Sequence, residues 1–274
     1  PVLHEPKPDM VMLYGDVNTT LAAALVCAKL GIAFSHVEAG LRSFDRTMPE
    51  EINRVATDQL ASLLFTPSID GNQNLAREGV AQERIHLVGN VMIDTLMRLL
   101  PQARRPQLAE MPERYALVTL HRPSNVDSEP RLREIITSLI ELSTILPVVF
   151  PIHPRTRERI ASFGLGSSLI GRIRLLEPLG YLEFLALQRS ATVVVTDSGG
   201  IQEETTFLGV PCLTLRENTE RPITSTIGTN KLIGNDMAVL RIEFESIARS
   251  GGKKGAVPPL WDGKAGERIA AIIA

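Results

Sequence analysis

Short apolar runs alternate along this chain with longer stretches in which apolar residues recur at helical spacing. Residues 10–14 and 193–195 are aliphatic and β-branched runs, typical of parallel strands that are covered on both faces. Residues 18–30 are rich in Ala and Leu, and Gly31 follows them as a C′ residue that ends a helix. The alternation predicts an α/β protein with parallel sheets.

Two series of elements result. In the first series we predict strands at 10–14, 32–37, 63–66 and 85–88, and helices at 18–30, 49–59, 68–79 and 92–99. In the second series we predict strands at 115–120, 148–152, 173–176, 193–195, 211–215 and 237–240. The second series has predicted helices at 129–144, after 154, at 181–189, up to 209, at 243–250 and at 263–273.

A proline-rich stretch separates the two series. Residues 96–112 contain three prolines and are predicted to be a linker. The predicted fold is two doubly wound, Rossmann-like domains, the first over residues 1–95 and the second over 113–274. The last helix, at about 263–274, is expected to pack back on the first domain. Polar residues after the strands are expected to line the cleft between the domains.

Composition narrows the class of protein. With 274 residues, 44% apolar and 22% charged, the chain is expected to be globular with a sizeable core. Its net charge of −2 gives no support for a nucleic-acid or anionic-membrane surface, so local arginines and backbone amides must bind any anionic ligand. Cys27 and Cys212 lie in apolar segments and are predicted to be reduced core thiols, not metal ligands.

The chain carries no recognisable targeting or membrane segment. No run reaches the roughly 18 apolar residues of a membrane span, and a cytoplasmic location is expected. The chain opens at Pro1, without an initiator Met, on a segment that soon enters a strand. We therefore expect that a part upstream of Pro1 is missing.

Residues 191–204 form the most informative stretch. They predict a buried strand, a turn at Asp197-Ser-Gly-Gly200 and the first turn of a helix, whose amides favour an anion. Ser198 adds a hydroxyl, and Glu203 and Glu204 add carboxylates, so a phosphate and a diol such as ribose would suit this surface. The alternative is that Asp197 or Ser198 is only a helix N-cap, and this stretch alone favours neither reading.

Carboxylates follow two strands of the first series. Asp16 follows the strand at 10–14, Glu38 follows the strand at 32–37, and Glu50 follows Pro49 at a helix start. Carboxylates held in a closed cleft can act as general base and general acid. Taken alone, Asp16 is better explained as a helix cap, and Glu50 as a first-turn carboxylate favoured by the helix dipole. Glu38 fits no cap, and we interpret it as functional.

Basic residues follow two strands of the second series. His121-Arg122 ends the strand at 115–120; a His there can shuttle a proton, and an Arg can bind phosphate as a fork. His153 precedes Pro154, and a structural turn explains it equally well. The charged segment 216–222 is either a solvated loop or a ligand contact. Phosphate-loop, dinucleotide, zinc and nucleophile-elbow motifs are absent from the sequence, so no metal or cofactor is expected.

Together these segments resemble the non-hydrolysing UDP-N-acetylglucosamine 2-epimerases. The matching stretches occur in the family's order and cover nearly the whole chain. They are Gly15-Asp16, His36-Val-Glu-Ala-Gly-Leu-Arg42, Pro49-Glu-Glu-Ile-Asn-Arg54, His121-Arg122, Asp197-Ser-Gly-Gly-Ile-Gln-Glu-Glu204, Thr219-Glu-Arg-Pro222 and Gly228-Thr-Asn230.

The resemblance implies a fold and a reaction. The fold is two Rossmann-like domains facing across a cleft, as in the GT-B glycosyltransferases. The reaction converts UDP-N-acetylglucosamine to UDP-N-acetylmannosamine by inversion at C2, without a cofactor. In this family UDP is eliminated to form a glycal and is then added back. A homodimer, a second UDP-N-acetylglucosamine as activator and a role in surface polysaccharide synthesis are also implied.

Residue roles carry over only where the motifs match. The resemblance implies that the catalytic residues are Asp16, Glu38, Glu50 and His121. It implies that UDP or the substrate is bound by Arg42, Arg122, Ser198, Gly199, Gly200, Glu204 and Arg221. The possible activator site matches Glu50, Arg122 and His153.

The chain departs from the family at its start. Family members open with a strand and a Gly-Thr-Arg-Pro-Glu turn that supplies an active-site arginine, and this sequence contains neither. We therefore expect the first domain to be truncated at its N-terminus and this chain to be weakly active or inactive. Three alternatives stay open: an epimerase of a related UDP-sugar such as a diacetamido-uronic acid, a non-catalytic nucleotide-sugar-binding module, and a GT-B glycosyltransferase.

Overall fold

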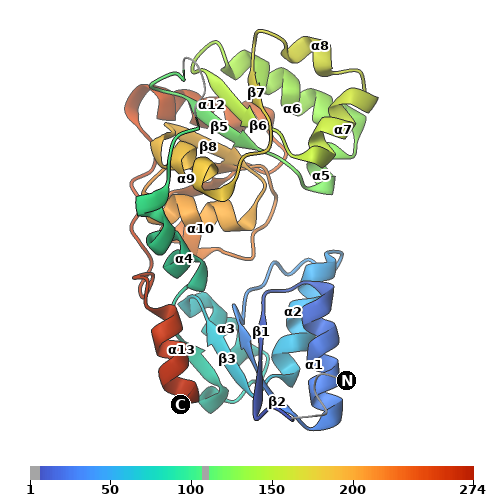
Figure 1. The fold of residues 1–274 in the computed structure, drawn as a ribbon. Helices are drawn as coiled ribbons and strands as arrows, with labels where there is room; N and C mark the ends of the chain where they lie inside the picture. Colours follow the sequence, from blue (N-terminus) through green and yellow to red (C-terminus); the bar gives the residue numbers. More distant parts are fainter. Residues whose placement is uncertain (1–6, 107–110) are drawn as a thin grey trace. The chain divides into compact units, whose positions relative to one another are not determined.

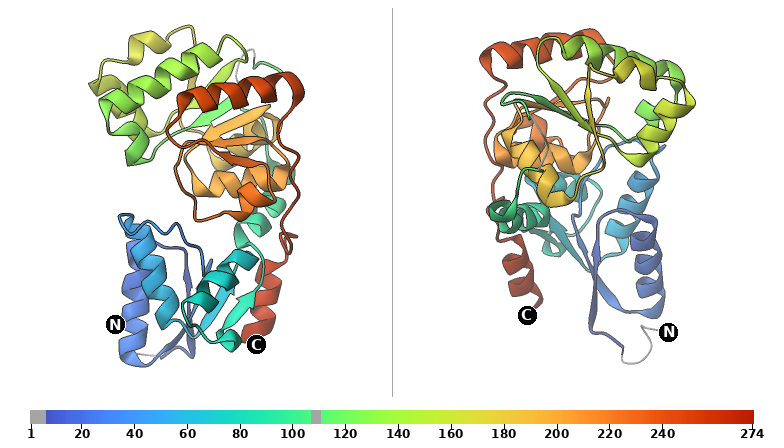
Figure 2. Two further views of the ribbon diagram at one scale, coloured as in Figure 1. Left: turned by 180° about the vertical axis from the view of Figure 1, so that it is seen from behind. Right: turned by 45° about the horizontal axis from the view of Figure 1, so that its top comes forward.

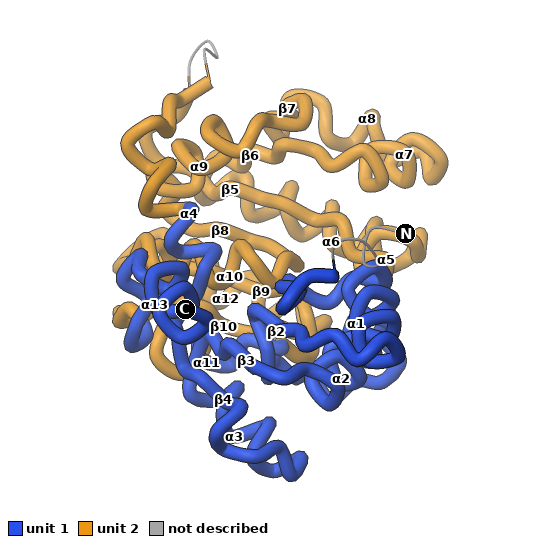
Figure 3. Tube along the Cα trace, turned by 60° about the horizontal axis from the view of Figure 1, so that its bottom comes forward, with its two compact units in different colours: residues 1–95, 220–223, 258–274 blue, residues 96–219, 224–257 orange. Residues whose placement is uncertain are grey.

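The computed structural model describes residues 7–106 and 111–274, and the chain divides into two compact units (Figure 3). Unit 1 contains the described residues up to Thr95, together with Glu220–Ile223 and Pro258–Ala274. Unit 2 contains the described residues of Leu96–Thr219 and Thr224–Val257. Part of the predicted linker, residues 107–110, lies outside the described residues, as do residues 1–6.

Unit 1 is built on a four-stranded parallel sheet in the order β1-β2-β3-β4 (Figure 1). Its strands are β1 (Met10–Tyr14), β2 (Ala33–Val37), β3 (Leu63–Thr66) and β4 (Ile85–Leu87). Its connections are α1 (Asn18–Leu30), α2 (Pro49–Leu60), α3 (Ile69–Arg77) and the 3-10 turn η1 (Gln82–Arg84), and α4 (Val91–Leu99) follows. Because the strands are parallel, their carboxyl ends lie at one edge of the sheet.

Successive residues of each strand in unit 1 pack on opposite faces of the sheet. On one face, Phe34 of β2 and Leu64 of β3 belong to the same buried cluster as Cys27 of α1. On the other face, Phe65 of β3 packs with Ile269 of α13 (Ala265–Ile273). Figure 1 shows α1 and α13 on opposite sides of this sheet. The strand pattern thus reflects burial on both faces.

The C-terminal segment joins unit 1 through directed contacts. Asp94 of α4 accepts hydrogen bonds from Ala265 N at 3.2 Å and from Gly266 N at 2.8 Å, at the start of α13. Trp261 is 2% exposed and donates from its indole nitrogen to Pro67 O at 2.9 Å. The last helix is therefore part of the compact unit formed by the first half of the chain.

Unit 2 is built on a six-stranded parallel sheet in the order β10-β9-β8-β5-β6-β7. Its strands are β5 (Ala116–Thr119), β6 (Val148–Pro151), β7 (Arg174–Leu176), β8 (Val193–Thr196), β9 (Cys212–Thr214) and β10 (Asn230–Leu232). This is the strand order of a Rossmann domain, in which the direction of winding reverses between the first and fourth strands. In this chain those strands are β5 and β8, and ligands bind such folds at that reversal.

Helices cover both faces of the unit 2 sheet. One face packs Val118 and Val195 against α6 (Glu129–Leu142) and α12 (Met237–Ser250), which lie side by side (Figure 2). The other face packs Leu117 and Val194 against α9 (Tyr181–Ser190) and α10 (Gly199–Leu208). The shorter elements are η2 (Leu100–Gln102), α5 (Pro123–Val126), α7 (Pro154–Ser162), α8 (Gly166–Leu169) and α11 (Ile223–Thr226).

Most predicted elements are confirmed, three of them at their predicted bounds: 10–14, 18–30 and 63–66. Gly31 ends α1 with φ 62°, in the left-handed region that glycine favours. The predicted parallel-sheet α/β fold is confirmed in both units, and the sheet of unit 2 is doubly wound.

The predicted strand at 237–240 is wrong, because these residues begin α12. Asp236 caps this helix, accepting from Ala238 N at 2.8 Å and Val239 N at 3.0 Å. Leu240, Phe244 and Ile247 are buried at spacings of four and three, as on the inner face of a helix. The last strand of the sheet is instead β10, which is only three residues long and begins with Asn230.

Neither a membrane span nor a metal cluster is found in the described part of the chain. No helix there is long and apolar enough to cross a bilayer, and no group of three or more His, Cys, Asp or Glu could hold a metal ion. Cys27 and Cys212 are buried and unpaired, which confirms the predicted core thiols. Burial raises the pKa of the Cys212 thiol to about 11, so the unreactive protonated form dominates near neutral pH.

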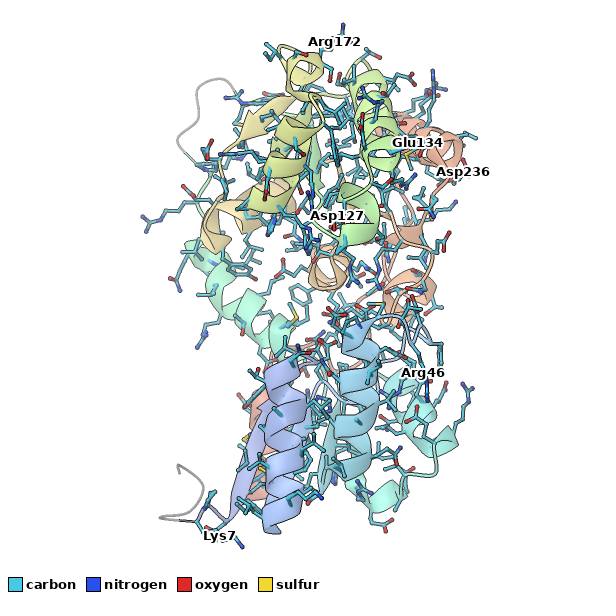
Figure 4. All side chains as sticks on the ribbon, turned by 90° about the vertical axis from the view of Figure 1, so that its right-hand side faces the viewer. Lys7, Arg46, Asp127, Glu134, Arg172 and Asp236 are labelled. Carbon is cyan, nitrogen blue, oxygen red and sulfur yellow. The ribbon has the colours of Figure 1, made fainter. Side chains whose placement is uncertain are left out.

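The cap of α12 yields a stability prediction. Asp236→Ala removes both capping hydrogen bonds, and we expect the free energy of unfolding of unit 2 to fall by about 1 kcal/mol. Ser128→Ala is the matched control, because Ser128 is the N-cap residue of α6 but its side chain makes no capping hydrogen bond. Urea denaturation checks both; equal losses would contradict the assignment. Figure 4 labels Asp236.

Candidate functional site

Unit 2 gathers polar residues where the winding of its sheet reverses. His121 and Arg122 follow β5, and Asp197 and Ser198 follow its neighbour β8. Asp197 is 0% exposed, and its carboxylate accepts from His121 N at 3.1 Å, Arg122 N at 2.9 Å and Asn125 Nδ2 at 3.2 Å. The two loops at the reversal are therefore joined through one buried carboxylate.

The Asp197 carboxylate is held in its charged form. His121 Nδ1 lies 3.1 Å from Asp197 Oδ1. Burial by itself would raise the pKa of Asp197, but the hydrogen bond and charge of His121, with the bonds from Arg122 N and Asn125, lower it overall. A charged Asp197 thus anchors the loop that carries His121 and Arg122.

Within the described residues, the side chain of the N-cap residue does not cap the start of α10. The Asp197 carboxylate binds the loop after β5, and within the described residues the Ser198 side chain makes no capping hydrogen bond. Gly199 and Gly200 form the first helical turn, where backbone N–H groups have no partner in the preceding turn. This geometry favours the phosphate reading of the turn over the cap reading.

His153 is both a structural and a site residue. Its Nδ1 accepts from Arg155 N at 3.2 Å and caps α7, as the structural alternative expected. Its ring also lies beside that of His121, with 5.4 Å between centroids. Partial desolvation and the neighbouring His121 charge lower the pKa of His153. His153 is therefore disposed to stay neutral beside His121.

Glu204 lies in α10 and faces Tyr181 at the start of α9. It is 4% exposed, and Tyr181 donates its hydroxyl to Glu204 Oε1 at 2.8 Å. Burial raises the pKa of Glu204, and the Tyr181 hydrogen bond offsets only part of that effect. A buried carboxylate of this kind gains from a ligand that donates hydroxyl groups to it.

The sheet of unit 1 brings two of the predicted carboxylates to one edge. Tyr14 of β1 pairs with Val37 of β2, so Asp16 and Glu38 both follow this paired position. The Asp16 carboxylate is 2.6 Å from Arg54 NH2, and its carbonyl accepts from Asn53 Nδ2 at 2.8 Å. Val17 is the N-cap of α1, so the reading of Asp16 as a helix cap is not realised.

Glu38 occupies an unusual backbone conformation. Its φ is 74°, in the left-handed region that a non-glycine residue rarely adopts. Its carboxylate forms an ion pair with Arg221, which belongs to the same compact unit. Arg221 also contacts Glu220, and both of these residues lie in Glu220–Ile223, the segment that crosses from unit 2 into unit 1. The strained backbone is consistent with a functional position for Glu38.

Glu50 and Arg42 differ in their surroundings. Glu50 is half-buried in the first turn of α2, where the alternative explanation placed it as a carboxylate favoured by the helix dipole. It directly precedes Glu51. Arg42 is 2% exposed and donates to both oxygens of Glu78 at 2.7 Å and to Leu41 O at 2.7 Å. The structure thus places Arg42 in the interior, paired with Glu78, and Arg42 is not part of the proposed site.

Several polar residues around the site were not singled out from the sequence. Glu51, Arg54 and Asp58 lie at spacings of three and four on the buried face of α2. A polar stripe on the inner face of a helix is the signal that could have revealed them. Glu51 accepts from Ser43 N and Phe44 N, each at 2.9 Å, and fixes the loop before α2.

Comparisons with known proteins match the whole chain. A model of the UDP-N-acetylglucosamine 2-epimerase family matches residues 1–274. The UDP-N-acetylglucosamine 2-epimerase of Methanocaldococcus jannaschii is 44% identical over 283 residues, covering 99% of this chain and 77% of the relative. The crystal structure of the M. jannaschii UDP-GlcNAc 2-epimerase in complex with UDP-GlcNAc and UDP is 45% identical, with a TM-score of 0.91 over 99% of this chain and 77% of that one.

A relative of different specificity is also similar. The UDP-2,3-diacetamido-2,3-dideoxy-D-glucuronate 2-epimerase of Pseudomonas aeruginosa is 42% identical over 243 residues, covering 87% of this chain and 68% of the relative.

The buried carboxylate at the reversal yields the next prediction. Asp197→Asn replaces an acceptor of several hydrogen bonds with an amide that turns N–H groups toward those donors. We expect the free energy of unfolding of unit 2 to fall by about 3 kcal/mol at pH 7, measured by urea denaturation. The matched control is Asp127→Asn, a surface carboxylate paired with Arg155 and Arg159, for which a small change is expected (Figure 4).

The same variant has an expected pH dependence. Folding lowers the pKa of Asp197, so its ionisation stabilises the fold above the unfolded-state pKa of about 3.9, and this contribution is lost as the pH falls through the folded-state value. The stability difference between wild type and Asp197→Asn should therefore shrink below about pH 4. A difference that stays constant on acidification would contradict a charged Asp197.

Proposed function

The chain belongs to the UDP-N-acetylglucosamine 2-epimerase family, an isomerase family, and we propose that it interconverts UDP-N-acetylglucosamine and UDP-N-acetylmannosamine. The observation that carries this proposal is the match over residues 1–274 combined with the contacts of Asp197. Those contacts leave the amides of Gly199 and Gly200 to a phosphate group at the reversal of a Rossmann sheet, whereas Ser198 N donates to Thr196 Oγ1 at 3.0 Å.

Unit 2 is proposed to bind UDP. The first turn of α10 receives the diphosphate, and His121 and Arg122 add donors beside it. Glu204, held by Tyr181, accepts hydrogen bonds from the ribose hydroxyls. These groups bind the nucleotide in substrate and product alike, and they stabilise the charge that appears on the diphosphate as UDP leaves.

Unit 1 is proposed to supply the proton transfers at C2, through Asp16, Glu38 and Glu50. A carboxylate removes the C2 proton, the C2–H electron pair forms a C1=C2 double bond, and the C1–O bond to UDP breaks. A protonated group then returns a proton to the opposite face of C2 while UDP adds back to C1. Arg54 beside Asp16 and Arg221 beside Glu38 hold these carboxylates in place.

Finer points of the proposal extend the family resemblance. We propose a homodimer, a cytoplasmic location and a second UDP-N-acetylglucosamine bound as activator near Glu50, Arg122 and His153. The closeness of the His153 and His121 rings supports an anion near both of them. We also propose that residues 96–112 link a first domain, 1–95, to a second, 113–274, whose last helix packs back on the first domain.

One NMR experiment tests the reaction. The protein is incubated with UDP-N-acetylglucosamine in deuterated water, and the C2 position is followed by proton NMR. We expect UDP-N-acetylmannosamine to form, with deuterium at C2 in both sugars. Unchanged substrate with retained UDP binding would instead identify a binding module, and free sugar would identify a hydrolase. A parallel incubation with UDP-2,3-diacetamido-2,3-dideoxyglucuronate tests the related specificity, because faster C2 exchange in that sugar would identify an epimerase of the diacetamido-uronic acid.

Glu38 provides the catalytic test. Glu38→Gln keeps the shape of the side chain but cannot accept the C2 proton, so we expect C2 deuteration to slow by about 10²–10⁴-fold. UDP affinity, measured by titration calorimetry, should stay within a few-fold of wild type. Glu83→Gln, an exposed carboxylate in the same unit, is the control and should leave both quantities unchanged. Loss of UDP binding in Glu38→Gln would mean that Glu38 binds the nucleotide instead.

Glu204 provides the binding test. Glu204→Gln removes a charged acceptor, and we expect UDP affinity to fall by about 10-fold or more, as for one hydrogen bond to a charged group. Thermal stability should not fall, because burial raises the pKa of Glu204 and its charge therefore disfavours the fold at neutral pH. Tyr181→Phe should give a smaller loss of affinity. If Glu204→Gln binds UDP with wild-type affinity, Glu204 does not bind the ribose.

A further inference from the structure

One histidine of unit 1 is buried beneath the proposed catalytic turns. His36 lies in β2 with its side chain 1% exposed. Its Nδ1 is 2.6 Å from Asp58 Oδ1, and its Nε2 is 2.9 Å from the carbonyl oxygen of Gly15. Asp58, which is 0% exposed, comes from α2, so the ring bridges α2 and the end of β1.

The two partners of His36 decide its protonation. A carbonyl oxygen and a carboxylate can only accept hydrogen bonds, so each ring nitrogen must carry a proton to make its contact. A neutral imidazole has only one N–H and would leave a lone pair facing an acceptor. The other oxygen of Asp58 accepts from Gly40 N at 3.1 Å and lies 2.7 Å from Arg42 NH1, as expected for an ionised carboxylate.

The charges around His36 balance only when it is cationic. The charged groups in this buried cluster are Asp58 and Arg42, with Glu78 paired to Arg42 and Glu38 nearby. Asp58 pairs with His36, Glu78 pairs with Arg42, and Glu38 pairs with Arg221. Desolvation alone would lower the pKa of His36, but the hydrogen bond and charge of Asp58 raise it overall, while His36 and Arg42 lower the pKa of Asp58.

The contacts of this pair reach both proposed catalytic turns. Gly15, whose carbonyl binds His36, directly precedes Asp16. Gly40, whose amide binds Asp58, lies two residues after Glu38. A Cβ added at Gly40 would lie 2.5 Å from Gly71 O, so the backbone at Gly40 packs directly against α3. The His36–Asp58 pair thus holds two turns, the Gly15–Asp16 turn through His36 and the Glu38–Gly40 turn through Asp58.

We propose that His36 is a permanently protonated positioning residue, which with Asp58 locks the Gly15–Asp16 and Glu38–Gly40 turns in their catalytic arrangement. This inference rests on the proposed epimerase function for its kinetic consequence, but the charge state of His36 does not. The ring takes no part in proton transfer, since both of its protons are held by buried acceptors.

Nitrogen NMR tests the charge state directly. With ¹⁵N-labelled histidine, the signals lost in His36→Gln identify the ring. We expect both of its nitrogens to show imidazolium shifts from pH 6 to pH 9, while the exposed His153, whose pKa is lowered, shows neutral imidazole shifts over most of this range. In Asp58→Asn, which keeps the ring, His36 should titrate or become neutral within this range. A neutral wild-type His36 at pH 8 would overturn the proposal.

Kinetics and backbone shifts test the positioning role. In His36→Gln we expect kcat to fall about 100-fold with KM and UDP affinity within about three-fold, as for misplaced reacting groups. The amide nitrogen of Asp16 should also shift, because its peptide carbonyl, that of Gly15, loses a hydrogen bond. The control is His86→Gln, a half-buried histidine of β4 in the same sheet, which should change neither quantity. Equal effects in both variants would mean that His36 contributes only to core packing and does not position the catalytic turns.

The outcomes separate the two proposals. If His36 is cationic and the Asp16 amide shifts, but the wild type shows no C2 exchange, the proposed function is contradicted and the positioning role of His36 stands. If the wild type shows C2 exchange but its His36 is neutral, only the positioning role is contradicted. If His36→Gln does not fold, the His36 ring is identified as the histidine whose nitrogen signals change in Asp58→Asn, and its titration in that variant decides the question.

Discussion

A carboxylate buried away from water must have its oxygens filled by donors, and this constraint organises both units of the protein. In unit 2, Asp197 has no exposed surface and draws its donors from the loop after β5. In unit 1, Asp58 has no exposed surface and draws its donors from β2 and the turn after it. In each unit, one carboxylate thus connects loops that the strands by themselves would leave independent.

The choice of partner by Asp197 has a functional consequence. An aspartate just before a helix commonly caps it, and here that role would occupy the amides at the start of α10. His121, Arg122 and Asn125 satisfy Asp197 instead, so the Asp197 side chain does not cap these amides, as the proposed anion site requires. The same contacts fix the position of His121, so one interaction both leaves these amides uncapped and places His121 beside them.

Unit 1 shows how a strained turn is maintained. Glu38 holds a left-handed φ of 74°, which by itself costs about 1–3 kcal/mol. Its amide and that of Ala39 both donate to Phe65 O, at 3.1 and 3.0 Å, and Asp58 holds Gly40 N. The surrounding contacts thus outweigh the local preference, and the glutamate is presented in a direction that an ordinary strand end would not give.

The sequence by itself determined the α/β class, most strands and helices, and the motifs that end the strands, because periodicity and glycine positions are local properties. It could not separate cap from ligand site at Asp16 or Asp197, since both uses require the same residues in the same order. It misplaced 237–240, where a short apolar run resembles a strand until Asp236 caps it as a helix. The tertiary structure showed that neither aspartate caps its helix and that 237–240 is helical, and it placed Arg42 in the interior. It also made His36 a bridge between β1 and α2, because partners 22 residues apart, such as His36 and Asp58, meet only when the sheet and α2 have packed together.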